Sequence, residues 1–345
     1  MGYKYMSNKP PIEVPQGAIR LNTDSQKLEF YAQDRWYEMA TDTPNLSTRQ
    51  TNGRGIFMGG HDGSANRQDR IDFITIATAG DAVDFGNLTD SRSAAGAIAS
   101  NTRAMLLGGT SPGNVNTVDF VTISITSDAI DFGDLTAARH WTQPASNQTR
   151  GLAAGGNPGT NVIDFCTIAT TGDFLDFGDL TNSVLSTPSV SANSSNQSPT
   201  RGFFGGGTPT NTNHIEFVTI TTLGNSQDFG DSTTQVAREA RGSSSTRALI
   251  IGGTRPEPSA SSIIDYFQMA TLGNAIDFGD STASSSNSAG CSDCIRVAFA
   301  HGNNPSNTDK IDYINISTGG NAIDFGDLTL ARNHLGGCSN GHGGL

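Results

Sequence analysis

The chain has 345 residues, of which 35% are hydrophobic, 16% are charged and 41 are glycine, so a core can be built from small residues, Phe, Ile and Val. Its net charge of -12 disfavours binding to phosphate backbones, so nucleic acid is not an expected partner. Residues 1–11 are polar and no stretch approaches transmembrane length, which predicts no signal peptide and no membrane insertion.

Residues 1–44 have no copy elsewhere in the chain and predict a small β-meander. Residues 17–21, 27–31 and 36–39 have the composition of three short strands. Three such strands are too few to be stable alone. We therefore expect this segment to dock on the rest of the chain or on another protein. The side chains that we expect to dock are Ile19, Leu21, Phe30, Tyr31 and Trp36.

Residues 45–345 are organised by an Asp-Phe-Gly sequence that occurs six times. Consecutive phenylalanines in it are 47, 45, 52, 49 and 47 residues apart, which is typical of one supersecondary unit repeated along the chain. The six copies contain Phe85, Phe132, Phe177, Phe229, Phe278 and Phe325.

Each repeat contains short strand-length segments and no amphipathic helical stretch. In the third copy, residues 150–154 end at paired glycines, and residues 163–168 and 174–177 follow. The acid of the second segment precedes the Asp of Asp-Phe-Gly by twelve residues in every copy, as from Asp164 to Asp176, which predicts a tight hairpin of fixed register. With the small-residue segment before each repeat's arginine, these segments predict an all-β, six-bladed β-propeller of four-stranded blades. A β-helix or an open sandwich is the alternative.

The two ends of the repeat region complement each other. The first copy begins at Arg54 without a preceding small-residue strand, whereas the last copy continues through residues 333–338. We expect this C-terminal strand to pair beside residues 55–60 and to close the ring, which would leave no blade unmatched.

The paired glycines, the period and the four-strand unit resemble kelch repeats and the galactose-oxidase-type propeller across residues 54–345. Kelch blades carry Tyr and Trp after the glycines, whereas this chain has Ile-Asp-Phe or Ile-Asp-Tyr there, and His301-Gly302 replaces the sixth glycine pair. The resemblance implies a propeller fold.

Residues 17–31, followed by Asp34-Arg35-Trp36-Tyr37-Glu38, resemble the short β-meander of tail-fibre and other virion structural proteins of tailed bacteriophages. This resemblance implies a virion location, with residues 1–44 attached to other virion proteins and several copies on each particle. It also implies a non-enzymatic protein, either a tail fibre or adhesin that binds host-surface glycan or a capsid decoration. A carbohydrate-active or oxidase-type propeller enzyme is the alternative.

An arginine stands five residues before each glycine pair, as Arg150 does, and we expect it to pair with the buried acid of its own repeat, here Asp164. The Asp-Phe-Gly-Asp-Leu-Thr sequence invites a calcium interpretation, but two side chains such as Asp131 and Asp134 supply too few oxygens, so turn capping is preferred. The pair Cys291 and Cys294 lacks the further ligands that zinc needs. No cofactor and no metal are expected, and no nucleophile or paired-carboxylate motif is present.

Residues that differ between copies are the candidates for ligand binding, because residues identical in all copies serve the blade. The variable loops after the paired glycines, together with the linkers between blades, should form one face, and polar loops with a few arginines suit sugars or protein surfaces. We also expect the histidines His61, His140, His214, His301 and His334 on that face. The candidate ligand-binding residues are Arg67, Arg70, Arg92, Arg139, Arg255, Arg332, Asn303 and Asn304.

Overall fold

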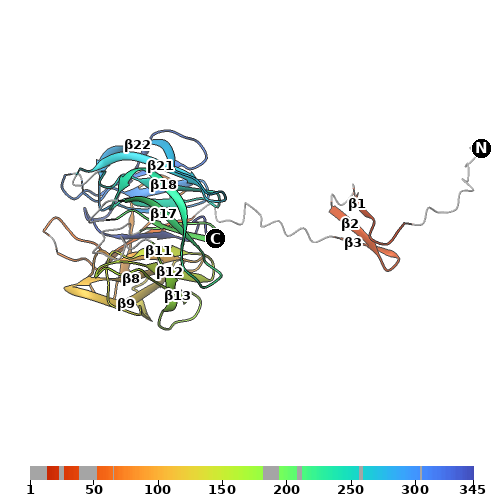
Figure 1. The fold of residues 1–345 in the computed structure, drawn as a ribbon, viewed down its shortest axis with the longest axis horizontal. Coiled ribbons are helices and arrows are strands. Elements are labelled where there is room, and N and C mark those ends of the chain that lie inside the picture. The colour runs from red at the N-terminus through yellow and green to blue at the C-terminus, as the bar shows by residue number, and fades with distance from the viewer. Residues whose placement is uncertain are drawn as a thin grey trace, which may run out of the picture. The chain divides into compact units, whose positions relative to one another are not determined.

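The computed structural model describes residues 14–22, 27–38, 53–64, 66–181, 194–207, 212–255, 259–303 and 305–345. The expected all-β class is confirmed, since these residues form strands and no helix (Figure 1). Within them, no helix is long and apolar enough to cross a membrane. The chain divides into two compact units, residues 1–49 and 50–345. The expected boundary at residue 44 lies outside the described residues.

The first unit is a three-stranded antiparallel meander, as predicted. Its sheet has the order β1 (Ile19–Asn22), β2 (Lys27–Ala32) and β3 (Arg35–Glu38). Ile19 pairs with Phe30, which in turn pairs with Tyr37, so these three side chains share one face of the sheet.

The second unit consists of six antiparallel four-stranded sheets, numbered here from the chain start. Sheet 1 contains β27 (Gly336–Ser339), β4 (Arg54–Met58), β5 (Arg70–Thr75) and β6 (Val83–Asn87). Sheet 2 contains β7 (Gly96–Ala99), β8 (Arg103–Ser111), β9 (Gly113–Thr122) and β10 (Ile130–Asp134). Sheet 3 contains β11 (Gln143–Ser146), β12 (Arg150–Ala154), β13 (Val162–Thr167) and β14 (Leu175–Asp179).

The remaining three sheets repeat the same order. Sheet 4 contains β15 (Asn196–Gln197), β16 (Arg201–Gly205), β17 (Thr212–Thr219) and β18 (Gln227–Val236). Sheet 5 contains β19 (Ala240–Ser243), β20 (Arg247–Ile251), β21 (Ser261–Gln268) and β22 (Ile276–Ser285). Sheet 6 contains β23 (Ala289–Ser292), β24 (Arg296–Ala300), β25 (Lys310–Asn315) and β26 (Ile323–Asp327). This arrangement fits a β-propeller.

The first strand of each sheet, which we call the inner strand, contacts the inner strands of two other sheets. The contacting pairs are β27 with β7, β7 with β11, β11 with β15, β15 with β19, β19 with β23, and β23 with β27. Strand β27 comes from the end of the chain and pairs antiparallel with β4, with Cys338 opposite Ile56. The first and last parts of this unit therefore share one sheet.

The Asp-Phe-Gly sequence lies in the last, outer strand of every sheet and forms a bulge there. In sheet 3, Ile163 pairs with Gly178 but Asp164 pairs with Asp176, so Phe177 is the extra residue. The bulge directs Phe177 into the space between sheets 3 and 4, where it is 3% exposed. Gly178 has a φ of +151°, a conformation that residues with a side chain rarely adopt.

The bulged outer strand binds the hairpin turn of the next sheet. Gly224 N donates to Phe177 O at 3.0 Å, and Ser226 N donates to Asp179 O at 2.9 Å. In return, Asp179 N donates to the Asn225 side chain at 3.0 Å. Equivalent backbone bonds run from Ala129 to Asn87, Gly172 to Phe132, Gly273 to Phe229, Gly320 to Phe278 and Gly80 to Phe325. All six sheets are thus tied to the sheet that follows.

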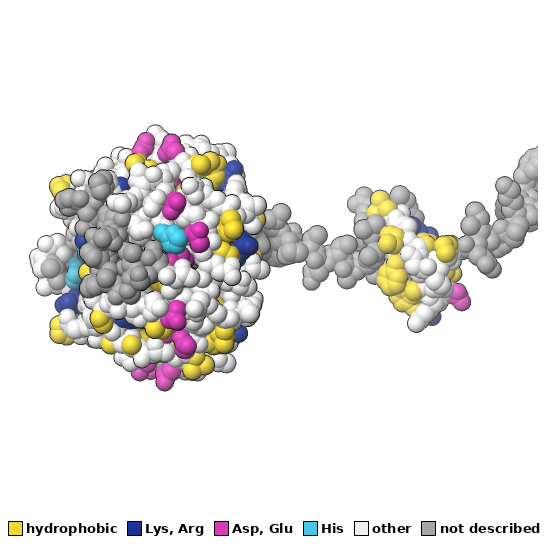
Figure 2. Space-filling model, viewed as in Figure 1, with side chains coloured by type: hydrophobic (Ala, Val, Ile, Leu, Met, Phe, Trp, Pro, Cys, Tyr) yellow, Lys and Arg dark blue, Asp and Glu magenta, His cyan; other side chains and the backbone are white. Residues whose placement is uncertain are grey.

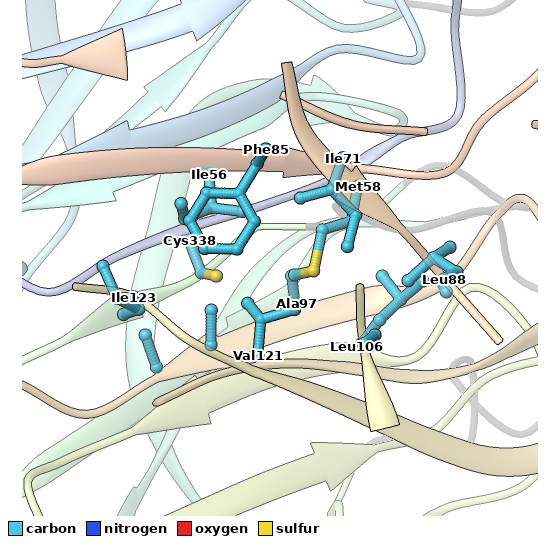
Figure 3. Packing of buried hydrophobic residues seen from close by; sticks show 14 residues of the cluster. Ile56, Met58, Ile71, Phe85, Leu88, Ala97, Leu106, Val121, Ile123 and Cys338 are labelled. Carbon is cyan, nitrogen blue, oxygen red and sulfur yellow. The ribbon is translucent and has the colours of Figure 1, made fainter. Parts of the chain in front are cut away.

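The hydrophobic residues are divided among clusters that lie between consecutive sheets. Figure 3 shows the cluster between sheets 1 and 2, where Ile56 and Met58 of β4 meet Leu106 of β8 and Val121 of β9. These four side chains are each at most 1% exposed. Full burial of one such side chain contributes roughly 1.5–3 kcal/mol, so packing between sheets is a large part of the stability of the unit.

The last residues of the inner strands are joined through buried serines. Ser339 donates its hydroxyl to Ser292 O, Ser292 donates to Ser243 O at 3.0 Å, and Ser243 donates to Gln197 O at 2.9 Å. Ser146 donates likewise to Ala99 O at 2.9 Å.

The C-terminal residues lie at this same end of the inner strands. His342 Nε2 is 2.8 Å from Ala99 O, and Gly343 N donates to Ser243 O at 3.1 Å. A cavity beside His342 has a volume of about 10 Å³, which leaves room for about one water molecule.

The contact between outer strand and turn predicts that replacing Gly178 by a residue with a side chain lowers the stability of the protein. A Cβ at Gly178 would lie 2.6 Å from Gly224 O, and the φ of +151° adds backbone strain. We expect Gly178→Ala to lower the free energy of unfolding by at least about 1–3 kcal/mol, measured by urea denaturation. Gly113→Ala is the control, because a Cβ there meets no atom within 4 Å. Equal stability of the two variants would contradict the proposed role of the contact.

Candidate ligand-binding site

The arginine that begins the second strand of each sheet does not pair with the acid of its own repeat, so that expectation is wrong. The Arg150 guanidinium lies 5.1 Å from the Phe165 ring centroid and donates to Ile220 O in the next sheet at 3.1 Å. The same stacking on an aromatic ring occurs for Arg54, Arg103, Arg201, Arg247 and Arg296. Each of these arginines therefore stacks on a ring of its own sheet and donates to a carbonyl group of the next sheet.

The buried acids are instead bound by residues that enter from the preceding sheet. Asp164 is 0% exposed and accepts from the hydroxyl of Thr136 at 2.8 Å, so this threonine does not cap its own turn. The linker residue Arg139 lies 2.7 Å from the same carboxylate. Equivalent ion pairs join Arg92 to Asp119 and Arg332 to Asp72, both at 2.8 Å.

Burial of these three linker arginines corrects their expected role as ligand-binding residues. Arg92, Arg139 and Arg332 are each at most 1% exposed, so they are not on the loop surface. Burial lowers the pKa of each guanidinium, and the paired carboxylate acts against this shift. Their role in the structure is to neutralise a buried acid.

The expected ligand residue Arg255 and the histidine His301 occupy comparable positions. Arg255, from a loop after paired glycines, lies 2.5 Å from Asp265 and is 8% exposed. His301 lies 2.7 Å from Asp312 and is 1% exposed. The linkers that lead into these two sheets carry Val236 and Ser285 where three others carry arginine, so the partner of the acid comes from a different loop.

The acid of sheet 4 is a glutamate with a different set of partners. Glu216 is fully buried and accepts from the hydroxyl of Ser226 and from Thr181 N. His214 Nε2 lies 3.4 Å from it. His214 and His301 therefore each lie beside a carboxylate of their own sheet.

The remaining candidate residues are divided between the surface and a loop cluster. Arg70 donates to the Thr329 hydroxyl at 3.0 Å in an exposed position. Arg67 donates to the Thr110 hydroxyl at 3.2 Å, which links the loops of sheets 1 and 2. Asn303 accepts a hydrogen bond from the Asn333 side chain. Asn304 lies outside the described residues.

A set of left-handed residues stands immediately before the inner strands. Of seven non-glycine residues with positive φ in the described parts of the chain, five occupy this one position, with φ between 52° and 62°. We call them the collar; they are Ala94, Trp141, Arg238, Asn287 and His334. This conformation costs an L-residue roughly 1–3 kcal/mol each and is typical of functional sites when it occurs away from glycine.

Backbone hydrogen bonds connect the collar residues to one another. Trp141 N donates to Ala94 O at 2.6 Å, and Ala94 N donates to His334 O at 2.8 Å. His334 N donates to Asn287 O at 3.2 Å. Because the collar precedes the inner strands and the serines end them, the two sets lie at opposite ends of these strands.

Aromatic side chains gather over the collar. His334 lies between Trp141 and His61, with centroid distances of 6.2 and 5.5 Å, and the His140 ring is 4.2 Å from that of Trp141. Ala94 stands between Trp141 and His334 in the collar, and its methyl group leaves room for the two rings. We call the collar together with His61, His140 and Arg67 the collar site.

Several buried polar atoms of the collar site have no hydrogen-bond partner. They are Trp141 Nε1, His140 Nδ1 and Asn287 Oδ1. Asn287 is 8% exposed. Buried polar groups are nearly always satisfied, and leaving one unsatisfied costs about 1–3 kcal/mol. Three such atoms belong to the collar site, and among the described residues Asn196, Gln197 and the linker arginines carry others.

Burial and neighbouring positive groups disfavour the protonated form of the histidines in the collar site. Burial, and then the charges of His61, Arg238 and His140, lower the pKa of His334 to about 3. Burial and Arg67 lower the pKa of His61, against the opposing effect of Asp62. The pKa of His140 is also lowered by burial. Three of the five histidines expected on one face are therefore close to one another.

The residues described here do not support metal or thiol chemistry. Across the described ranges, no group of three or more His, Cys, Asp or Glu side chains is placed to hold a metal ion. Burial raises the pKa of Cys166 to about 12 and that of Cys291 well above its ordinary value, which makes these thiols inert at neutral pH. The collar site offers aromatic faces, imidazoles, guanidiniums and an amide, which are able to stack on other groups and to form hydrogen bonds.

The sequence matches no known protein-family model, and no curated protein matches it significantly.

In sheet 3, the ion-paired Arg139 and the stacked Arg150 are expected to contribute differently to the free energy of unfolding. We expect Arg139→Ala to lower the free energy of unfolding by roughly 3–5 kcal/mol, because Asp164 is left buried without its counter-ion. Arg150→Ala should cost only about 1–2 kcal/mol, since it removes a cation–π contact and one hydrogen bond to a carbonyl. Urea denaturation of both variants measures the difference, and equal costs would refute the assignment of the counter-ion.

Proposed function

We propose that residues 50–345 form a closed six-bladed β-propeller in which each four-stranded sheet is one blade. The support is the cyclic series of contacts between inner strands and the bond from Gly80 in sheet 1 to Phe325 in sheet 6. The pairing of β27 with β4 would close the ring. In this arrangement the collar surrounds one mouth of the propeller axis, and the C-terminal residues cover the other.

We infer that the propeller is a non-enzymatic recognition module whose collar site binds host-surface glycan. The observation that carries this proposal is the set of three unpartnered polar atoms of the collar site, which belong to Trp141, His140 and Asn287. Carbohydrates present both apolar ring faces, which stack on tryptophan, and hydroxyl groups, which satisfy buried donors and acceptors. The backbone bonds that link Trp141, Ala94, His334 and Asn287 hold these side chains in place before a ligand arrives.

The proposed location is a tailed-phage virion, with residues 1–44 as the attachment to other virion proteins. Support comes from the resemblance of the meander to virion structural proteins and from its apolar surface. Ile19 and Leu21 are 64% and 60% exposed and Phe30 is 36% exposed, on one face of the sheet (Figure 2). Tyr31 and Trp36 lie on the opposite face, where Arg20 stacks on Trp36 at 4.1 Å.

A face that carries exposed Ile, Leu and Phe on a three-stranded sheet is stabilised when another protein covers it. Several copies on one particle, in a tail fibre or as capsid decoration, would raise the avidity of weak individual sites.

Glycan binding is tested by removing the tryptophan ring. Trp141→Ala is suited to this because Ala94 already occupies the equivalent left-handed position, so the backbone tolerates alanine. On a glycan array, we expect the wild type to bind and Trp141→Ala to bind at least about tenfold more weakly. Leu175→Ala, which changes an exposed side chain of an outer strand, is the control. Absence of binding by wild type would refute the proposal, and release of a cleaved or oxidised sugar would show an enzyme instead.

Attachment through the meander is tested on assembled particles. Replacing Ile19 and Leu21 by serine should abolish incorporation, because the exposed apolar face is lost while the strand pairing remains. Replacing the equally exposed Ile130 by serine in the propeller should leave incorporation unchanged. Quantitative blotting of purified particles measures both, and normal incorporation of the double variant would exclude this face as the attachment site.

A further inference from the structure

Two surface pockets of the second unit lie at equivalent positions in sheets 6 and 1. The pocket of sheet 1 has a volume of about 310 Å³ and is lined by Phe73 of β5, Val83 of β6 and residues of the turn between these strands. The pocket of sheet 6 has a volume of about 180 Å³ and is lined by Tyr313 and Ile323, which hold the same positions in β25 and β26. Both volumes are at or below the lower end of the roughly 300–1,000 Å³ that small-molecule sites occupy. Each pocket therefore suits a single side chain of a partner.

The lining of each pocket includes an aliphatic side chain that stands exposed on the outer strand. Val83 pairs with Phe73 and Ile323 pairs with Tyr313, so an aliphatic and an aromatic side chain share one face of each sheet. Val83 and Ile323 are each 56% exposed. The fold accepts a polar residue at this position, since Gln227 occupies it in sheet 4. Apolar side chains exposed around a pocket are typical of a surface that another molecule covers.

Carboxylates crowd the junction of sheets 6 and 1, beside both pockets. Asp81 belongs to the lining of the sheet 1 pocket, and the exposed Asp324 follows Ile323 of the sheet 6 pocket. Asp327 N donates to the Asp81 carboxylate at 3.1 Å, which joins the two sheets. Burial, and then the charges of Asp309, Asp81 and Asp324, raise the pKa of Asp327. A positive group placed here would relieve the repulsion among these acids.

The basic side chains of this region do not neutralise the junction. The guanidiniums of Arg54 and Arg296 each lie 4.8 Å from the aromatic ring centroid of one pocket and donate to backbone carbonyls. Lys310 acts against the pKa shift of Asp327 without reversing it. In the described part of the chain, no basic side chain forms a salt bridge with these carboxylates.

The bond that Asp81 makes does not require its charge. In sheets 4, 5 and 6, the amide side chains of Asn225, Asn274 and Asn321 accept the equivalent backbone bond at 3.0, 3.1 and 3.1 Å. The turn of sheet 3 carries Asp173, which accepts this bond at 3.0 Å. The sequence of the turn therefore sets the charge of each junction without changing how the sheets are joined.

We propose that the two pockets and the adjoining carboxylates bind a segment of another protein that carries both aliphatic and basic side chains. Aliphatic side chains of the segment enter the pockets, and its lysines or arginines lie against Asp81 and Asp324. A second copy of this chain is a poorer occupant, because a net charge of -12 makes two such acidic surfaces repel each other. The surface shares no residue with the collar site, so the proposal does not depend on glycan binding.

The test uses three extended synthetic peptides, titrated calorimetrically into the full-length protein. Leucine and lysine alternate in the first peptide; aspartate replaces lysine in the second, and serine replaces leucine in the third. We expect the first to bind at least about tenfold more tightly than either of the others, and added salt to weaken it. Failure of the first peptide to bind overturns the proposal. Equal binding of the second excludes the role of charge, and equal binding of the third excludes the role of the pockets, so either result also overturns it.

A pair of glutamine substitutions assigns the binding to the pockets. Val83→Gln combined with Ile323→Gln should weaken the leucine–lysine peptide at least about tenfold, because both aliphatic groups are lost at a position where Gln227 shows that glutamine is accepted. Ile130→Gln combined with Leu175→Gln, at the same position of sheets 2 and 3, is the matched control and should bind normally. Equal affinity of the two double variants overturns the assignment. Self-association of the protein that the first pair abolishes would make a second copy the occupant and also overturn the proposal.

A pair of asparagine substitutions tests the carboxylates at constant fold. Asp81→Asn combined with Asp324→Asn should weaken the peptide several-fold and reduce its salt dependence. Asp173→Asn combined with Asp131→Asn removes the same charge from the junction of sheets 2 and 3 and should leave binding unchanged. An equal effect of both pairs would show attraction to the net charge alone and overturn the proposal. The urea midpoint of each variant confirms that it is folded.

Discussion

The bond between each outer strand and the turn of the next sheet is the constraint on which the second unit depends. It requires a bulge, a glycine with positive φ and a turn of fixed length, as at Gly178 and Gly224. The same bulge sends Phe177 into the space between the sheets. One short sequence therefore sets the hydrogen bonds, the packing and the register between neighbours, which explains why the interval from Asp164 to Asp176 recurs unchanged in every copy.

A second connection between neighbouring sheets is made at the buried acid. Only one of the two partners of this acid has the same residue type in all six copies. The threonine from the preceding sheet is present in all six copies, as Thr136 is for Asp164. The other partner of the acid is a linker arginine in three sheets, Arg255 in sheet 5 and His301 in sheet 6. A buried carboxylate needs a counter-charge within contact distance, but that charge can come from any loop that reaches it. Loops that do not supply this counter-charge can differ in sequence.

The sequence was sufficient to predict the strands, their hairpin register and the meander, because period and turn chemistry are local properties. It was not sufficient to assign the ion pairs. Arg150 and Arg139 are both near Asp164 in the chain, and only the three-dimensional path of the linker decides which guanidinium reaches the carboxylate. The collar was also missed, although His140 and His334 were expected on one face. Its members share a backbone conformation but no side-chain type, so no repeated residue marks the position.

The two ends of the inner strands differ in a way that determines where a ligand can enter. At one end, serine hydroxyls and the C-terminal residues satisfy the exposed carbonyl groups, and the cavity beside His342 holds about one water molecule. At the other end, the collar leaves polar atoms of Trp141 and Asn287 unpartnered. Among the described residues of the second unit, the left-handed non-glycine residues all lie at this end, whereas unpartnered polar atoms also occur elsewhere, as at Gln197 and Arg332. A sixfold repeat thus supplies a common support, while the side chains of the collar differ from sheet to sheet.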